Sequence, residues 1–272
     1  MLDKAGRITE IEDDSERDFV LVQKHLEALA QGQSSLVVSP NHAEAKNVAD
    51  KIRSSLRECG AIGAEERIVQ RLVNTGWTYA ERRDATLYHA GQVVEFHRGS
   101  WSLAQDQQKR VRFTRGEQWL VVEASENKVL VEHNGQSASL GTSRANDFAV
   151  YAREELHLSI GDTVRITKNH PSSDGVTLLN NWRFAIESIS ESELMLTNGA
   201  KFDLRRPMHL DQGYAVTSHS SQGQTVDQVL VAAPVRSMDL VSAIMFYVGV
   251  SRARNHVQVF TDSRAALLEA VE

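Results

Sequence analysis

Apolar positions near the start of the chain recur with the spacings that distinguish helices from strands. Four of them share one face of a predicted helix: Phe19, Val22, Leu26 and Leu29. The short apolar run 36–38 follows, which is typical of a strand buried in a parallel sheet. A second helix is predicted over 42–59, because Asn41 offers a cap at its start and Gly60 a stop at its end.

The carboxyl-terminal part repeats this alternation of strand and helix. Strands are predicted at 215–217, 229–231 and 257–260, and helices from His219 onward, over 238–252 and over 263–271. Short buried strands that alternate with helices are typical of an α/β domain with a parallel sheet. The two ends of the chain are therefore expected to meet in one domain.

The segment between these two parts has a different pattern. From 88 to 210, runs of β-branched and aromatic residues alternate with Gly, Asn and Ser turns, which predicts short strands. Residues 116–123 match 180–187 at an offset of 64, and residues 91–96 match 161–166 at an offset of 70. The match is either a coincidence between two hairpins or an internal repeat, and the number of aligned positions favours the repeat.

We therefore expect two tandem small β-barrels of SH3-like size to interrupt the α/β domain. The predicted parts are 1–87 and 211–272 for the α/β domain, 88–155 for the first insert and 156–210 for the second insert. The Asn-Gly pairs at 134–135 and 198–199 suit two-residue hairpins, whose turns need positive φ at both central residues.

Composition narrows the class of protein. The chain is 41% hydrophobic and 24% charged, as ordinary globular proteins are, and no apolar run is long enough to span a membrane. Its acidic start lacks an apolar export signal, and a single Cys59 excludes an internal disulfide, which together predict a cytoplasmic location. The net charge of -6 argues against a basic nucleic-acid coat, so any contact with DNA is expected to be local.

The run 214–225 is the first that could carry chemistry, since it places hydroxyl, imidazole and amide side chains where a strand turns into a predicted helix. These residues are Thr217, Ser218, His219, Gln222 and Gly223. Such a junction presents free backbone N–H groups and the positive end of a helix dipole, which suits a phosphate. The simpler alternative is a capped helix start with a surface histidine. A Ser/His hydrolase is disfavoured because no G-x-S-x-G motif is present.

The run 246–254 is the second. A helix that is apolar almost all round ends there at Arg252 and Arg254. Cations near a helix carboxyl end are favourable for the dipole alone. The alternative is that a guanidinium on a rigid helix serves phosphoryl transfer as an arginine finger.

Together these two runs resemble motifs V and VI of superfamily 1 helicases of the RecD-like branch. Thr217, His219, Gln222 and Gly223 fit the pattern T-x-H-x-x-Q-G, and 247–254 fits Y-V-A-x-[ST]-R-A-R with Gly249 in place of the usual Ala. The strand and helix at 36–57 look like motif IV, with Arg53 as the arginine that reaches the nucleotide, although Asp50 stands where Asn is frequent. The order of parts is similar to the helicase half of conjugative relaxases of the TraI/TrwC type.

The resemblance implies an ATP site divided between two RecA-like domains. The chain has no G-x-x-x-x-G-K-[ST] phosphate loop, so it resembles the second domain only, and the Mg ligands are expected in the first, amino-terminal RecA-like domain of the same protein. By the same resemblance, Arg252 would act on the γ-phosphate with help from Arg53. The nucleotide would also be contacted by Gln222, Gly223 and Arg254, and single-stranded DNA by Thr217, Ser218 and His219.

The resemblance therefore implies the motor half of an ATP-dependent DNA helicase that travels 5′ to 3′, and the isolated chain is not expected to be an active ATPase. The alternative function is a binding module that recruits conjugative secretion machinery on a vestigial RecA-like scaffold. Trp119 and Trp182 are predicted to fill the cores of the two barrels, with base stacking as the alternative. His89, His97 and His133 lack a metal-ligand spacing.

Overall fold

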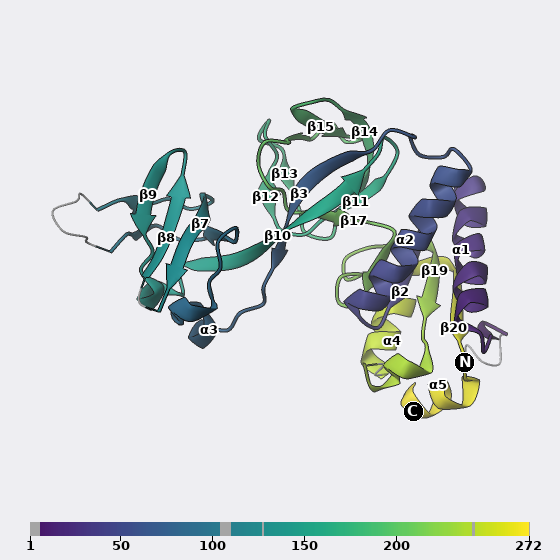
Figure 1. Ribbon diagram of the computed structural model, residues 1–272. Coiled ribbons are helices and arrows are strands. Elements are labelled where there is room, and N and C mark those ends of the chain that lie inside the picture. Colours follow the sequence, from purple (N-terminus) through teal and green to yellow (C-terminus); the bar gives the residue numbers. More distant parts are fainter. Residues whose placement is uncertain (1–5, 104–109, 127, 241–242, 272) are drawn as a thin grey trace. The chain divides into compact units, whose positions relative to one another are not determined.

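The structure, a computed structural model, describes residues 6–103, 110–126, 128–240 and 243–271 (Figure 1). The chain forms two compact units. The larger unit comprises 1–67, 157–204 and 210–272, and the smaller unit comprises 68–156 and 205–209. Residues 68–87, expected to belong to the α/β domain, thus lie with the first β insert, and 205–209, expected in the second insert, lie there as well.

A five-stranded parallel sheet is the centre of the larger unit. Its strands, in spatial order, are β1 (Ile8–Glu10), β20 (Ala253–Thr261), β19 (Val226–Ala232), β2 (Ser35–Ser39) and β18 (Ala215–Thr217). Strands from both ends of the chain alternate in it, so the predicted α/β class with a parallel sheet is confirmed.

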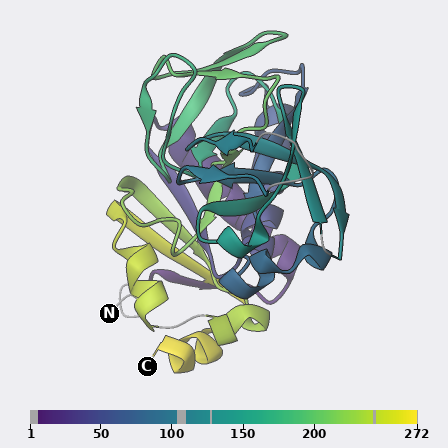
Figure 2. The ribbon, with the colours of Figure 1, turned by 90° about the vertical axis from the view of Figure 1, so that its left-hand side faces the viewer.

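Helices cover both faces of this sheet (Figure 1; Figure 2). Val37 points to the face that packs against α1 (Asp14–Ala30) and α2 (His42–Glu58). Its neighbours Leu36 and Val38 point to the other face, against α4 (Ala243–Val250) and α5 (Arg264–Val271). Because both faces are buried, the strands are continuous apolar runs, which is why they could be predicted from sequence.

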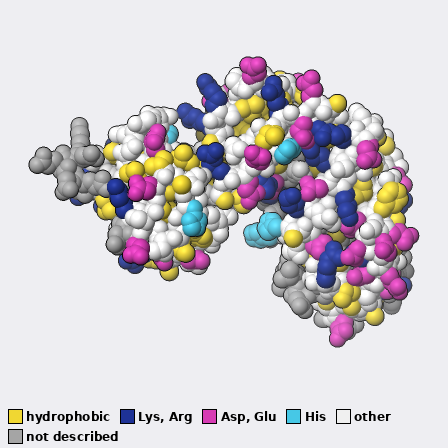
Figure 3. All heavy atoms as spheres, in the orientation of Figure 1, with side chains coloured by type: hydrophobic (Ala, Val, Ile, Leu, Met, Phe, Trp, Pro, Cys, Tyr) yellow, Lys and Arg dark blue, Asp and Glu magenta, His cyan; other side chains and the backbone are white. Residues whose placement is uncertain are grey.

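The first two helices begin at side-chain caps. Asp13 accepts a hydrogen bond from the backbone N–H of Glu16, and Asn41 accepts one from that of Glu44. The helix predicted over 42–59 is confirmed by α2. Acidic side chains line the α1 side of the larger unit in Figure 3. No helix in the described ranges is long and apolar enough to cross a membrane.

The helix predicted from His219 onward is wrong. Residues 218–223 form turns, and after two further residues β19 begins at Val226. The hydroxyl of Thr217 accepts from the N–H of Ser220, and the hydroxyl of Ser221 donates to the carbonyl of Ser218. Such local side-chain bonds compete with helix formation. The helix predicted over 238–252 is also shorter than expected, since α4 spans Ala243–Val250 and a 3-10 helix, η3, spans Val235–Leu240.

The middle of the chain forms two antiparallel meanders with the same strand order. The first, in the smaller unit, runs through β4 (Val93–Phe96), β7 (Gln118–Ser125), β8 (Lys128–His133) and β9 (Gln136–Ser139), and its sheet also includes β3 (Arg67–Asn74) and β10 (Phe148–Leu158). The second, in the larger unit, runs through β11 (Thr163–Ile166), β14 (Arg183–Ile189), β15 (Glu193–Leu196) and β16 (Lys201–Asp203), with β17 (Leu210–Gln212) at the edge. We call them the first and second β modules. Their common order supports an internal repeat.

The alignment of the two modules differs by one residue from the one predicted. Trp119 pairs with Val94, and Phe184 pairs with Val164, so the offset in β7 and β14 is 65 (184 − 119), while that in β4 and β11 is 70 as predicted. A shift of one residue exchanges the two faces of a strand. Trp119 is 1% exposed and fills the core of the first module, as predicted, but Trp182 is 44% exposed, so its predicted core position is wrong.

The two Asn-Gly turns differ as well. Asn134 and Gly135 both have positive φ, 49° and 76°, and join β8 to β9 as the predicted two-residue hairpin. In the second module the backbone N–H of Leu196 bonds to the carbonyl of Ala200, so three residues form the loop, and of its Asn-Gly pair only Gly199 has positive φ.

Candidate functional site

Hydroxyl side chains gather where β2 and β18 end. Thr217, the last residue of β18, lies beside Ser39, the last residue of β2. Thr217, Ser218 and Ser39 are all buried, and the Ser39 hydroxyl has no hydrogen-bond partner among the described residues. Because an unpaired buried hydroxyl costs free energy, this edge of the sheet has unused hydrogen-bonding capacity.

The next residues of the run 214–225 are exposed. His219 and Gln222 lie on the turn 218–223, and the backbone N–H of Gln222 bonds to the carbonyl of His219 at 3.3 Å. Gly223 has φ +80° and open space where a Cβ would stand. The turn therefore gives an exposed imidazole, an exposed amide and a bare stretch of backbone that a ligand can approach closely.

Arg252 follows α4 and is half-buried. Its Nε donates to the carbonyl of Val248 at 3.0 Å, and its Nη2 donates to the hydroxyl of Ser251 at 2.8 Å. No described carboxylate forms an ion pair with it. The backbone carbonyl of Arg252 accepts from the N–H of Val226 at 3.0 Å, so this arginine meets the end of the 218–225 connection where β19 begins. The structure thus brings the two sequence runs together.

Helix α4 approaches the sheet closely at Gly249. A Cβ at this position would lie 3.2 Å from Cγ1 of Val38 and 3.9 Å from the hydroxyl oxygen of Ser218. The glycine lets the last turn of the helix lie directly against β2 and the start of the motif V turn. It thereby fixes the backbone that leads to Arg252.

Arg254 is already paired. Its Nη1 lies 3.6 Å from Oδ1 of Asp227, and it is more exposed than Arg252. Hydrogen bonds from the hydroxyl and backbone N–H of Ser34 hold the pKa of Asp227 below its usual range, and the charge of Arg254 contributes to this. Arg254 therefore shares its charge with a carboxylate, whereas Arg252 does not.

Arg53 is engaged by a different set of side chains. Its Nε donates to both carboxylate oxygens of Asp162 at 3.1 Å, and its Nη1 donates to Glu66 at 2.7 Å. The hydroxyl of Tyr214 also donates to Asp162, at 2.7 Å, and burial raises the pKa of this phenol. Arg53 therefore connects α2 to the loop that precedes β11 of the second β module.

Tyr247 is a residue to which the sequence pattern gave no role. It lies on α4 one turn before Ser251, whose backbone N–H bonds to its carbonyl, and it is 72% exposed. Large apolar side chains of such a helix are usually buried, so the exposure of Tyr247 is unexpected. The carboxyl end of α4 thus carries an exposed aromatic ring and is followed by an arginine without a described carboxylate partner, which marks it as a surface available for a ligand or another domain.

Residues 212–260 match the family described as UvrD-like helicase C-terminal domain. Over 247 residues the chain is 24% identical to the multifunctional conjugation protein TraI of Escherichia coli strain K12, and the match covers 88% of the chain and 13% of TraI. A solved structure of Pif1 helicase from Bacteroides, in complex with ADP-AlF3 and ssDNA, is 14% identical with a TM-score of 0.23, covering 84% of the chain and 40% of that Pif1 chain. Pif1 helicase from Candida albicans is 13% identical with a TM-score of 0.27, covering 86% and 47%.

The family match begins at the last residue of β17 and ends within β20. It includes the turn 218–223, Gly249 and Arg252, but neither Ser39 nor Arg53. At 212–260 the chain is thus similar to the UvrD-like helicase C-terminal domain, the C-terminal type of domain of superfamily 1 helicases, and along most of its length it is similar to part of TraI.

Proposed function

We propose that this chain is the second RecA-like domain of an ATP-dependent helicase that acts on single-stranded DNA in conjugation. The proposal rests on the environment of the Arg252 guanidinium. Its guanidinium stands at the end of a helix packed on the parallel sheet, has no carboxylate partner in the described structure, and adjoins the motif V connection through Val226. A cation kept without a counter-ion is suited to an anion that comes from outside the domain.

In this proposal Arg252 neutralises charge on the γ-phosphate of ATP bound by a preceding phosphate-loop domain. An arginine in this role accelerates phosphoryl transfer by a factor on the order of 10³–10⁵. Gln222, Gly223 and Arg254 are proposed to contact the nucleotide as well, with Gln222 and Gly223 linking it to the DNA track. By the same resemblance, the Mg ligands are assigned to the phosphate-loop domain.

The hydroxyl-rich edge is proposed to hold the DNA backbone. Thr217, Ser218 and His219 lie where β18 ends, and the unpaired hydroxyl of Ser39 lies next to them. Neutral donors of this kind bind phosphate oxygens without a strongly basic surface. This is compatible with a chain whose net charge is -6.

For Arg53 we propose a positioning role. Sequence resemblance assigned it to the nucleotide, but Asp162 and Glu66 together engage Nε, Nη1 and Nη2 of its guanidinium. It would thus hold the second β module against α2. The two β modules are proposed to be SH3-like inserts, on the strength of their shared strand order, and a cytoplasmic location and contact with conjugative secretion machinery belong to the same proposal.

The proposal predicts that the purified chain hydrolyses ATP negligibly, because its sequence has no phosphate loop. Single-turnover hydrolysis measured with the purified chain checks this, and appreciable turnover would refute a divided site. The reading frame upstream of Met1 is a second test. A phosphate loop encoded there supports a motor domain, whereas a stop codon directly before Met1 favours the alternative binding module.

With a phosphate-loop domain present, Arg252→Ala is expected to lower DNA-stimulated ATP turnover by a factor on the order of 10³. The affinity for single-stranded DNA should stay unchanged, because Arg252 lies outside the proposed DNA contacts. Arg67→Ala, at an exposed arginine remote in sequence from both motifs, is the matched control and should keep full turnover. If turnover of the Arg252→Ala variant equals that of this control, the finger role is refuted.

A further inference from the structure

The first β module carries a two-stranded ribbon formed by β5 (Ser100–Trp101) and β6 (Arg112–Phe113). Trp101 pairs directly with Arg112, and the backbone N–H of Ser102 bonds to the carbonyl of Val111 at 2.9 Å. The two segments therefore stay in contact as far as Ser102 and Val111, and the backbone N–H of Leu103 bonds to the carbonyl of Ser139 at 3.0 Å. Side chains alternate between the faces of a strand, so Trp101 and Leu103 share one face, as do Arg110 and Arg112, and the Trp101–Arg112 pair puts both sets on the same face of the ribbon.

The two faces of the ribbon are very different. On the inner face Phe113 stacks on Phe96 with ring centroids 4.3 Å apart and meets Trp119 edge-on at 4.9 Å. On the outer face Trp101 is 46% exposed and Leu103 is 47% exposed. Packing of the module accounts for the inner face. It gives no reason for a tryptophan on the outer one.

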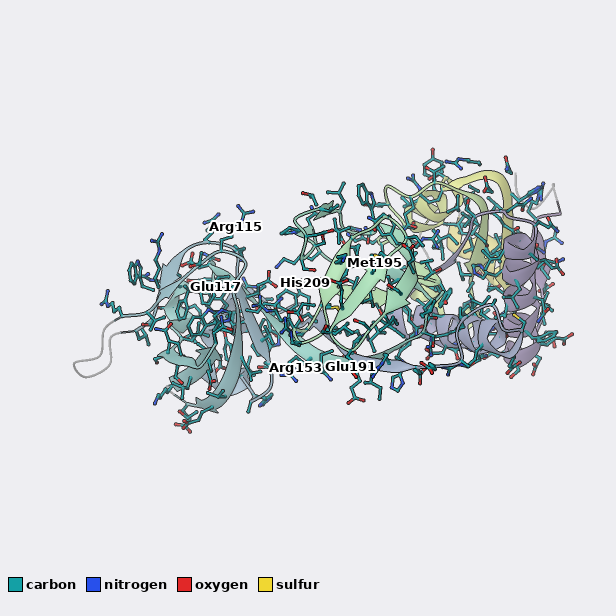
Figure 4. The ribbon with its side chains drawn as sticks, turned by 90° about the horizontal axis from the view of Figure 1, so that it is seen from above. Arg115, Glu117, Arg153, Glu191, Met195 and His209 are labelled. Atoms are coloured by element: carbon teal, nitrogen blue, oxygen red, sulfur yellow. The ribbon has the colours of Figure 1, made fainter. Side chains whose placement is uncertain are left out.

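The outer face is also basic. Arg110 and Arg112 are exposed there, and Arg98 and Arg115 are exposed on the adjoining turns. Figure 4 shows Arg115 pointing away from the module. None of the four forms an ion pair with a carboxylate in the described ranges. Between 97 and 115 the sequence has five Lys or Arg and one Asp, in a chain whose overall balance is 30 against 36, so the positive charge is concentrated here.

We propose that the outer face of this ribbon, made by Trp101, Leu103, Arg110 and Arg112 with Arg98 and Arg115 beside it, binds single-stranded nucleic acid. A base stacks on the exposed indole of Trp101, and the backbone phosphates pair with the guanidinium groups. The indole of Trp101 would find no base to stack on in a duplex, whose bases are already stacked on one another. This contact requires no ATP and shares no residue with the proposed site around Thr217 and Arg252. It can therefore be tested independently of the proposed helicase function.

The second β module supplies an internal comparison. It too carries a ribbon after its first strand, β12 (His170–Pro171) with β13 (Thr177–Leu178), and Trp182 is exposed just beyond it. The nearby arginines are already engaged. Arg165 lies 3.3 Å from Asp211, and the buried Arg183 donates to the carbonyls of Ser35 and Gly213. Trp182 thus has an exposed ring without free cations, which makes it a matched control for Trp101.

The test is the fluorescence anisotropy of a labelled oligothymidylate of about 20 nucleotides, titrated with the chain at several salt concentrations. Trp101→Ala should weaken binding by about fivefold or more, as expected for the loss of one stacked base. Trp101→Phe should restore most of it. Arg110→Gln combined with Arg112→Gln should reduce the slope of log affinity against log salt by about 1.4, which is about 0.7 for each lost phosphate contact.

The controls are Trp182→Ala and Arg67→Gln, which should leave affinity and salt slope as in the original chain. Circular dichroism shows whether each variant folds. The proposal is overturned if the Trp101→Ala and double arginine variants bind like these controls. It is also overturned if the original chain binds a duplex of equal length as tightly as the single strand, or binds only vesicles of anionic lipid.

Discussion

Replacing Asp162 by Asn tests whether the second β module is held to the parallel-sheet domain by a buried ion pair. The Asp162 side chain is 1% exposed and accepts hydrogen bonds from Nε and Nη2 of Arg53, from the backbone N–H of Ser159 at 2.6 Å and from the hydroxyl of Tyr214 at 2.7 Å. The substitution removes the negative charge and turns one acceptor into a donor that faces other donors. The guanidinium would keep Glu66 as its carboxylate partner.

Removing one member of a buried pair costs about 3–5 kcal/mol, and because Glu66 remains we expect about 3 kcal/mol from Asp162→Asn. Tyr214→Phe removes a single hydrogen bond to the same carboxylate and should cost about 1 kcal/mol. Urea denaturation gives the free energy of unfolding, and the fluorescence of Trp182 reports on the larger unit, because Trp77, Trp101 and Trp119 belong to the smaller one.

A double-mutant cycle with Arg53→Met separates the pair from its surroundings. If Arg53 and Asp162 act together, the double variant should lose about 2 kcal/mol less than the sum of the single losses. Simple addition of the two losses would refute the coupling. It would leave Arg53 available for the nucleotide, as its sequence position suggests.

Three further predictions concern stability. Burial lowers the pKa of His25 from 6.5 to about 4. Between these two values the unfolded chain binds a proton that the folded chain excludes, so the larger unit should be about 2 kcal/mol less stable at about pH 5 than at about pH 7. Thermal melts of His25→Gln should lack this pH-dependent loss of stability. Gly213→Ala should cost about 2 kcal/mol in urea denaturation, since the new Cβ would stand 2.9 Å from Cγ2 of Thr163, while Gly99→Ala meets only an atom at 3.9 Å and should be nearly neutral. Trp119→Ala should destabilise the smaller unit by about 3–5 kcal/mol, whereas Trp182→Ala should change the larger unit by less than about 1 kcal/mol; equal losses would contradict the one-residue shift between the modules.

The parts of the fold that could be predicted from sequence are those set by local patterns. The strand β2 is a continuous apolar run, and α2 has an apolar face with a cap at Asn41, so the signal for each lies within its own residues. The helix expected from His219 fails because hydroxyl groups in the turn bond to the nearby backbone, which a count of apolar residues does not register.

In the candidate site, too, features set by nearby residues could be predicted from sequence, whereas contacts with distant residues could not. Arg252 and the motif V turn are close in sequence to the strands that place them, so their proximity followed from the order of strands and helices. The partner of Arg53, by contrast, is 109 residues away in an inserted module. The periodicity of α2 gives no sign of Asp162, whereas the resemblance of 36–57 to motif IV assigns Arg53 to the nucleotide, which stays a prediction.

The second β module joins the parallel sheet through an unusually short connection. Its last strand, β17, ends at Gln212, and β18 begins at Ala215, so only Gly213 and Tyr214 lie between them. Both are anchored: the carbonyl of Gly213 accepts from Arg183, and the hydroxyl of Tyr214 donates to Asp162. A displacement of the second β module is therefore expected to displace Thr217 as well, because the two-residue connection is too short and too well anchored to absorb it. The position of the module is thus coupled to the end of β18.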